Sequence, residues 1–304
     1  MGRIVVVGSL NMDLVVRVDR MPAPGETIRG HDFHTIPGGK GANQAAAISQ
    51  LGGQVAMVGH VGDDAFGPQL VGNLQARGVD TRYVSAVAGV ATGTALIMVD
   101  SQGENSIVIA PGANALVSPQ DIDACDDLLR QAEYLVLQCE IPLETVSYAI
   151  RRAAQHGVRV VLNPAPARDL PRELLRGVHY LVPNESEAES LCGRKVYDAD
   201  TARQAARQLH AQGVPVVIIT LGSQGALVLT DDETFQMPAP QVRVVDTTAA
   251  GDAFVGGLVV SLSRGLSLRE AVRYAVCAGA VAVSRFGAQT SLPAHAEVQS
   301  LCDG

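Results

Sequence analysis

The sequence predicts an α/β protein whose doubly wound, mainly parallel sheet is flanked by helices and carries a small β-sheet lid. Two observations lead to this class. Short runs of β-branched residues alternate with alanine- and leucine-rich stretches of helical period, as in buried parallel strands joined by helices. Two pairs of short strands interrupt this alternation. The 304 residues, 47% of them apolar, suffice for one large α/β core.

The regular elements are expected in a repeating order along the chain. Strands are expected at residues 4–7, 54–58, 134–137, 158–162, 180–182, 214–220 and 242–245. Helices are expected at residues 42–51, 69–77, 144–155, 201–212, 250–263 and 268–285. Because ligands bind beyond the carboxyl ends of parallel strands, chemistry is expected in the loops that follow them.

Four short strands depart from the parallel pattern. Residues 14–18 and 27–36 flank a proline- and glycine-rich turn, and residues 94–99 and 105–110 flank Asp100–Gly103, a good hairpin turn. We predict a separate small sheet, inserted as about 14–36 and 94–110, that serves as a lid. The alternative is two antiparallel hairpins at the edge of the main sheet. Since neither repeat nor linker is visible, residues 1–304 are expected to form a single domain.

Composition restricts the partners and the compartment. The net charge of −8, the absence of tryptophan and the 4% aromatic content disfavour binding to nucleic acid. Five scattered cysteines without a C-x-x-C pair indicate free thiols in a reducing compartment. The chain starts almost directly with an apolar strand, and no apolar stretch reaches the length of a membrane span. We therefore expect a cytoplasmic protein that binds small molecules and no membrane.

The strongest local signal is the segment Asp246–Asp252, which precedes the predicted helix at 250–263. Small residues at a helix start leave backbone N–H groups accessible, and the helix dipole favours an anion there. Asp252, in the first turn, is placed to take a proton from an attacking hydroxyl beside a bound phosphate. The alternative is that Asp252 only caps the helix.

Two further loops carry polar groups suited to a sugar. Gly39 and its glycine neighbours permit close backbone approach, and Lys40 and Asn43 then offer donors to hydroxyls or phosphate. The loop matches neither the Walker A pattern nor Gly-x-Gly-x-x-Gly. Asn11 and Asp13 follow the first strand and could grip vicinal hydroxyls. Simple turn chemistry, including an Asx turn at Asn11–Asp13, is the alternative in each case.

Three later loops add to this edge of the sheet. Glu140 follows the strand at 134–137, and Asn184 and Glu187 follow the next short strand, near where Mg²⁺ and phosphate would lie. Glycines after Thr220 could admit a nucleotide. Each loop alone is more often a turn than a site, but six polar loops at one sheet edge are hard to explain by packing.

Together these segments resemble the ribokinase-type carbohydrate kinases. Gly38–Asp64 and Asp246–Gly257 are similar to the two family signatures, and the resemblance covers nearly the whole chain. The segments Asn11–Asp13, Gly41–Gln44, Asn163–Ala167 and Gly287–Gln289 resemble the members that act on ribose. The resemblance implies transfer of the ATP γ-phosphoryl to O5 of D-ribose, giving D-ribose 5-phosphate, by a homodimer whose lids pair.

The resemblance also implies a role for each matching position. The sugar ligands would be Asn11, Asp13, Gly39, Lys40, Asn43 and Glu140, with Asp252 as the catalytic base. Backbone N–H groups of Ala249, Ala250, Gly251 and Asp252 would form the anion hole. ATP would contact Asn184, Thr220, Gly222, Ser223, Gly225 and Gly251, with Asn184 and Glu187 near Mg²⁺. The K⁺ ligands, mostly backbone carbonyls, would be Asp246, Thr248, Ala282, Arg285, Gly287 and Ser291.

Two positions depart from the family pattern, and two other functions stay open. Ala249 stands where many members have glycine, which is harmless only if its φ is negative. Val276 lies where some members present a histidine to the nucleotide. The acceptor could instead be 2-deoxyribose, another pentose or a nucleoside. A sugar or nucleotide sensor without catalysis is the remaining alternative, because a fold alone does not determine function.

Overall fold

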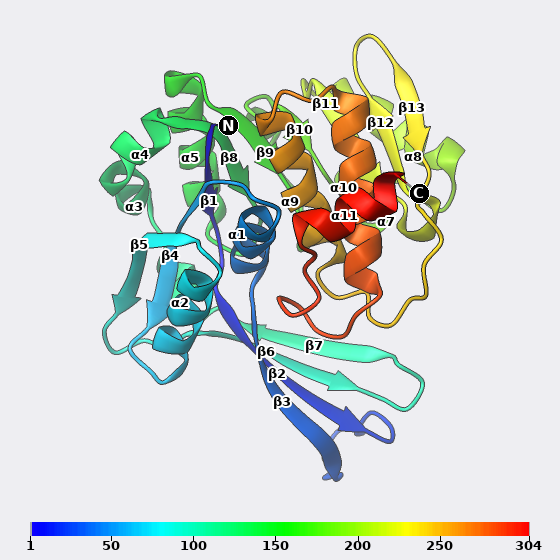
Figure 1. The fold of residues 1–304 in the computed structure, drawn as a ribbon. Coiled ribbons are helices and arrows are strands. Elements are labelled where there is room, and N and C mark those ends of the chain that lie inside the picture. The colour runs from blue at the N-terminus through cyan, green and yellow to red at the C-terminus, as the bar shows by residue number, and fades with distance from the viewer. Residues whose placement is uncertain (1, 304) are drawn as a thin grey trace.

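The computed structural model describes residues 2–303 and is built on a nine-stranded sheet (Figure 1). Its order is β13-β12-β11-β10-β9-β8-β1-β4-β5, and all neighbours are parallel except β11–β12 and β12–β13. The strands are β1 (Arg3–Val7), β4 (Val55–Gly62), β5 (Asp80–Val87), β8 (Ala132–Leu137), β9 (Arg159–Leu162), β10 (Tyr180–Leu181), β11 (Val216–Thr220), β12 (Ala226–Leu229) and β13 (Thr234–Met237).

Helices cover both faces of this sheet, because its inner strands are apolar on both sides. One face packs on α1 (Lys40–Gln50), α2 (Phe66–Ala76), α9 (Ala250–Ser263), α10 (Leu268–Val283) and α11 (His295–Asp303). The other face packs on α3 (Pro119–Ala124), α4 (Asp126–Arg130), α5 (Leu143–His156), α6 (Arg172–Leu175), α7 (Glu185–Cys192) and α8 (Ala199–His210). Ile4 and Val6 point to the first face and Val5 and Val7 to the second. The doubly wound prediction is confirmed.

A second, four-stranded sheet extends from one side of this body (Figure 1). It consists of β2 (Asn11–Val18), β3 (Gly30–Gly38), β6 (Gly93–Val99) and β7 (Asn105–Ala110), in the order β3-β2-β6-β7. The two predicted hairpins join through a parallel pairing of β2 with β6. The separate sheet is confirmed, and the alternative of hairpins at the edge of the main sheet is wrong. Two short 3₁₀ helices, η1 (Gly112–Leu116) and η2 (Gly222–Gln224), complete the fold.

One predicted strand is wrong. Residues 242–245 form no strand, and Val244 and Val245 are 61% and 52% exposed. These β-branched residues lie in an irregular segment, where the backbone N–H of Val245 donates to the carbonyl of Val283 at 2.8 Å. The C-terminal part of the main sheet is instead extended by the antiparallel strands β12 and β13, which the sequence patterns did not indicate.

Two expectations from composition can be compared with the structure. All five cysteines are free thiols, as predicted, and four of them are buried. Within residues 2–303, no helix combines the length and the apolar character needed to cross a bilayer.

Candidate active site

The turn between β3 and α1 packs directly onto the loop that follows β1. Gly39 has φ +88°, and a Cβ atom there would lie 2.6 Å from the backbone nitrogen of Asn11. A Cβ atom on Gly41 would lie 2.6 Å from the backbone nitrogen of Ser9. Side chains at these positions would push the two loops apart. Glycine therefore lets the predicted sugar residues of both loops meet.

Asp252 lies in the first turn of α9 and faces this junction. It is 5% exposed, and its carboxylate accepts hydrogen bonds from the side-chain amides of Asn43 and Gln44, each at 3.0 Å. The structure thus brings the predicted base against the glycine–lysine turn, although 209 residues separate Asp252 from Asn43. Asp252 does not cap its helix, because no side-chain cap is present at α9. Its carboxylate is oriented toward α1 instead.

A buried amide network holds Gln44 in place. Its side-chain NH₂ group donates to Asn163 Oδ1 at 3.1 Å as well as to Asp252, and its carbonyl oxygen accepts from the amide of Gln138 at 2.6 Å. Asn163 in turn donates to the backbone carbonyl of Val182 at 2.9 Å. These side chains are almost inaccessible to water. They fix the orientation of the Asp252 carboxylate from behind.

The residues predicted to bind the sugar lie around the same junction. Asn11 is buried, and its Oδ1 accepts from the side chain of Asn114 at 2.7 Å. That contact leaves the NH₂ group of Asn11 as the donor for a ligand. Asn114 also hydrogen-bonds both backbone groups of Leu10, so it holds the whole loop. Asn43 Oδ1 is buried without a hydrogen-bond partner, an exception to the rule that buried polar atoms are paired.

Acidic groups crowd this junction and perturb one another. Burial, and then the nearby charges of Glu140 and Asp252, raise the pKa of Asp13 to about 7. Burial alone would lower the pKa of Lys40, but the carboxylates of Asp252 and Glu140, among others, raise it above its ordinary value. Lys40 therefore stays protonated among carboxylates. Its backbone N–H donates to Glu140 Oε2 at 3.1 Å, which places Glu140 beside the turn.

The start of α9 is open to an anion. Of the predicted anion-hole donors, Ala250 is not free, because its backbone N–H donates to the carbonyl of Thr247 at 3.3 Å. In residues 2–303, the backbone N–H groups of Gly251 and Asp252 have no hydrogen-bond partner. A Cβ atom on Gly251 would meet no atom within 4 Å, so the space beside this residue is open. Free amides and the helix dipole together favour a phosphoryl group.

Ala249 precedes these amides in a left-handed conformation, with φ +59°. The negative φ that would make alanine harmless here is therefore absent. A left-handed alanine costs about 1–2 kcal/mol relative to its preferred conformation, so this turn is strained.

A cavity of about 680 Å³ lies next to the start of α9 and has the size of a small-molecule site. All the predicted ATP residues line it, namely Asn184, Thr220, Gly222, Ser223, Gly225 and Gly251. Its apolar walls come from Ala239, Pro240, Val242 and Val244 and from one side of α10, where Val276 lies. The misassigned segment 242–245 thus contributes to a cavity instead of to a sheet.

Asn184 and Glu187 form the N-terminal capping box of α7. Asn184 Oδ1 accepts from the backbone N–H of Glu187 at 2.8 Å, and the carboxylate of Glu187 accepts from the backbone N–H of Asn184 at 2.9 Å. The two side chains therefore have a structural role in capping the helix. This role does not prevent Asn184 from contacting a ligand, because Asn184 also lines the cavity. Burial raises the pKa of Glu187, although its contact with Asn184 and the charge of Lys40 act against the shift.

The predicted K⁺ residues lie on the loop before α9, in the last turn of α10 and on the loop that follows α10. Asp246 accepts from the backbone N–H and the hydroxyl of Thr248 at 2.9 and 2.6 Å, and from the backbone N–H of Gly287 at 2.9 Å. The carbonyl of Ala282 accepts from the backbone N–H of Arg285 at 3.2 Å, and the buried Ser291 donates to the carbonyl of Ala288 at 2.8 Å. The loops are tied together through Asp246. Oxygen donors of this kind suit hard cations.

Sequence reasoning missed the residues that support the site. No role was assigned to Gln44, Asn163, Gln138 or Asn114, although the first two lie in segments that carry the family resemblance. Buried amides follow no periodicity and no ligand spacing. Their only sequence signal was polar side chains inside apolar segments that are otherwise expected to be buried.

The chain is similar to known carbohydrate kinases over its whole length. The model of the "pfkB family carbohydrate kinase" matches residues 1–295. A protein named ribokinase from Haemophilus influenzae is 40% identical over 96% of this chain and 95% of its own length. A protein named deoxyribokinase from Salmonella typhi is 41% identical over 95% of both chains. The structure of Arabidopsis thaliana ribokinase complexed with ribose and ATP matches with a TM-score of 0.92, at 35% identity, covering 100% of this chain and 99% of that one.

Proposed function

Because the chain belongs to the pfkB family of carbohydrate kinases, we propose that it phosphorylates D-ribose at O5 with ATP, giving D-ribose 5-phosphate and ADP. The observation that carries the proposal is the contact of Asp252 with both Asn43 and Gln44, at the boundary between the polar junction and the nucleotide cavity. Gly251 lines that cavity, and Asp252 is the next residue. One short segment therefore faces both substrates.

The proposed reaction uses this segment for two tasks. Asp252 accepts the proton of the sugar hydroxyl as its oxygen attacks the γ-phosphorus, while the bond to the β,γ-bridging oxygen of ATP breaks. The free N–H groups of Gly251 and Asp252 stabilise the negative charge of the transferring phosphoryl group. The side-chain amides of Asn43 and Gln44 donate to both oxygens of the carboxylate and so orient it.

The sugar would be held by groups from three loops. Asn11 and Lys40 offer donors, and Asp13 and Glu140 offer acceptors to hydroxyls. A bound sugar that hydrogen-bonds to Asp13 would favour its ionised form, against the burial that raises its pKa. The small sheet carries Asp13 on β2, which supports the proposal that this sheet acts as the lid of the single domain.

Two cations are part of the proposal. Mg²⁺ would be held mainly by ATP phosphates, with Asn184 and Glu187 nearby, and would neutralise charge on the phosphates. The burial that raises the pKa of Glu187 is consistent with a carboxylate that gains from a neighbouring cation. K⁺ would be held by oxygens of the Asp246 and Gly287 loops, where the carboxylate of Asp246 already binds both. K⁺ there would order the loop before α9.

We also propose that the protein is a homodimer through its small sheet. Phe33 on β3 and Val108 on β7 are 62% and 61% exposed, and Leu96, Ile107 and Ile109 add further exposed apolar surface. Both β3 and β7 are edge strands, which is where unprotected surface invites pairing. Light scattering after gel filtration should give twice the chain mass, and Val108→Lys should shift the measured mass toward that of the monomer.

The expected cytoplasmic location stays a prediction.

The test of function is a sugar panel. Purified protein with ATP, Mg²⁺ and K⁺ should release ADP with D-ribose, and the product should be D-ribose 5-phosphate. No ADP release above background with any pentose would reject catalysis. Tight binding of ribose without turnover would indicate the sensor alternative.

A second acceptor is favoured by one specific observation. The relative named deoxyribokinase is as similar to this chain as the one named ribokinase, at 41% and 40% identity. The panel therefore includes 2-deoxyribose, other pentoses and a nucleoside. A higher kcat/KM for 2-deoxyribose than for ribose would reassign the substrate while leaving the chemistry intact.

A further inference from the structure

Phe286 lies outside both substrate sites, in the loop between α10 and α11, and it contacts the small sheet. Its ring lies edge-on to that of His34, with centroids 6.3 Å apart, and the guanidinium carbon of Arg17 lies 5.9 Å from its centroid. Figure 1 shows the α10–α11 connection reaching toward the small sheet. Phe286 is 47% exposed, so burial in the core does not explain it.

Both partners of Phe286, Arg17 and His34, lie on strands that end at the proposed sugar-binding residues. Arg17 is on β2, the strand that contains Asn11 and Asp13, and His34 is on β3, which ends at Gly38 just before the Lys40 turn. In the register of these strands, Asp13 pairs with Ile36 and Val15 pairs with His34. Paired residues point to the same face, so His34 shares a face with Asp13. A movement of this sheet on sugar binding would therefore shift the residues that contact Phe286.

The backbone next to Phe286 is connected by hydrogen bonds to the turn before α9, where the phosphoryl group is proposed to bind. Its neighbour Gly287 donates to Asp246 Oδ2 at 2.9 Å, and Asp246 Oδ1 accepts from Thr248 directly before the strained Ala249. On the other side of the loop, the Thr290 hydroxyl donates to the carbonyl of Phe286 at 2.9 Å. Three hydrogen bonds to Asp246, one from Gly287 and two from Thr248, thus connect the Phe286 loop to the turn that presents the free amides of α9.

We propose that Phe286 is a positioning residue that couples sugar binding under the small sheet to the nucleotide and phosphoryl side of the site. The inference rests on the proposed function, since it assigns these two sides to sugar and ATP. Sugar binding sets the position of β2 and β3, the ring of Phe286 follows, and the Asp246 loop is held in place before α9. By linkage, each substrate then tightens the other by the same factor.

The expected coupling is small because the contact is partly exposed. An exposed cation–π contact corresponds to about a two- to fivefold effect on an equilibrium. We therefore expect D-ribose to tighten binding of a non-hydrolysable ATP analogue at least about twofold in the unsubstituted protein. In Phe286→Ala the ratio of the Kd values with and without ribose should fall to about 1, with smaller changes in either Kd alone. Phe286→Tyr keeps the ring and should keep the coupling.

Isothermal titration calorimetry of each ligand alone and in the presence of the other measures the coupling directly. Tyr197→Ala is the matched control, because Tyr197 is another exposed aromatic side chain and is 72% exposed. Coupling retained in Phe286→Ala, or absent from the unsubstituted protein, would overturn the inference while the proposed function stands. An unsubstituted protein that binds no ribose at all would overturn the proposed function and the coupling with it.

Discussion

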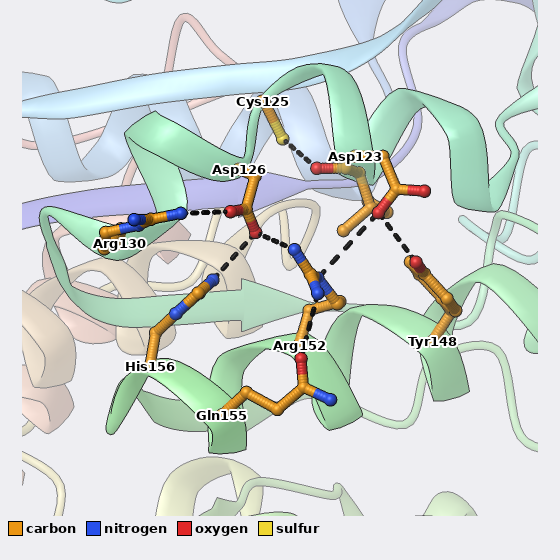
Figure 2. A network of polar contacts seen from close by, with 9 residues as sticks. Asp123, Cys125, Asp126, Arg130, Tyr148, Arg152, Gln155 and His156 are labelled. Atoms are coloured by element: carbon orange, nitrogen blue, oxygen red, sulfur yellow. Dashed lines mark hydrogen bonds and ion pairs between the residues drawn. The ribbon is translucent and has the colours of Figure 1, made fainter.

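Two carboxylates, Asp126 and Asp252, are held in opposite ways in this molecule. Asp126, at the start of α4, accepts hydrogen bonds from three potential cations, Arg130, Arg152 and His156 (Figure 2). The bond from His156, followed by those from the arginines, lowers the pKa of Asp126. Asp252 is more deeply buried, yet its direct partners are two neutral amides.

The difference separates a structural network from a functional one. The protein's own cations satisfy the carboxylate of Asp126, although Arg152 Nε in the same cluster is buried without a hydrogen-bond partner. Around Asp252 the polar groups lack some of their partners. Asp13 has a raised pKa, and Asn43 Oδ1 and Gln138 Oε1 are buried without hydrogen-bond partners. Such a site destabilises the empty protein and gains from whatever supplies the missing donors and cations. The same residue type thus has two roles, set by its surroundings.

Removing Lys40 should break the functional network most strongly. In Lys40→Met, the Asp13 carboxylate loses the nearby cation that lowers its pKa, so that pKa should rise further and the loss of stability should be greater at pH 8 than at pH 5. We expect kcat/KM to fall about 10²–10³-fold. Steady-state kinetics and thermal unfolding at both pH values measure this. Lys195→Met, at a largely exposed lysine, is the control.

Asp13→Asn should separate binding from stability. Because folding raises the pKa of Asp13 from 3.8 to about 7, its contribution to stability is complete at pH values below 3.8 and is lost as the pH rises through 7. The empty variant should therefore be more stable than the unsubstituted protein by ~1–3 kcal/mol at pH 8, with a smaller gain at pH 5. Affinity for ribose should fall about tenfold or more.

Urea unfolding at the two pH values, together with ribose titration, checks that prediction. Asp19→Asn, at an exposed aspartate just beyond β2, provides the comparison. A stability gain that does not depend on pH would contradict the assigned cause, because a simple packing change has no titration.

Ala249→Gly should release the strain before α9. A left-handed φ of +59° suits glycine better than alanine, so the variant should gain ~0.5–1 kcal/mol of unfolding free energy. Ala199→Gly, in the first turn of α8, should lose stability instead, because glycine is a poor helix former. Chemical denaturation measures both. Equal losses in the two variants would show that Ala249 is not strained.

The smallest effect is expected at the structural network around Asp126. Asp126→Asn should lower the melting temperature by only about 2 °C at neutral pH and leave turnover unchanged. Because the pKa of Asp126 is lowered in the fold, the difference should vanish as the pH falls into the acid range. A loss of activity in this variant would remove the distinction between the two networks.

The parts of the fold that follow a period could be predicted from the sequence. Buried strands such as β1 and β8 showed continuous apolar runs, and the departures from that pattern indicated the small sheet. The strand predicted at residues 242–245 was wrong because a run of β-branched residues has the pattern of a strand even where it lines a cavity. Glycines and small residues also predicted the two loops that meet at Asp252, since close approach needs them.

Other features of the site depend on contacts that sequence spacing does not encode. Gln44 and Asn163 meet across 119 residues in the buried amide network. The positive φ of Ala249 depends on how the turn enters α9, and alanine itself gives no sign of it. Phe286 meets Arg17 only because the C-terminal loop reaches the small sheet. Tertiary packing determines all three.

The central claim is that Asp252 takes the proton from the sugar hydroxyl, and Asp252→Asn tests it most directly. Asparagine keeps the size of the side chain, and its single amide oxygen can accept from one of the two α1 amides that now donate to Asp252, but it cannot serve as the base. Rapid-quench measurement of a single turnover with saturating ATP and ribose should show phosphoryl transfer slowed about 10²–10⁴-fold, with both Kd values within a few-fold of the unsubstituted protein. Transfer at a near-normal rate would contradict the account.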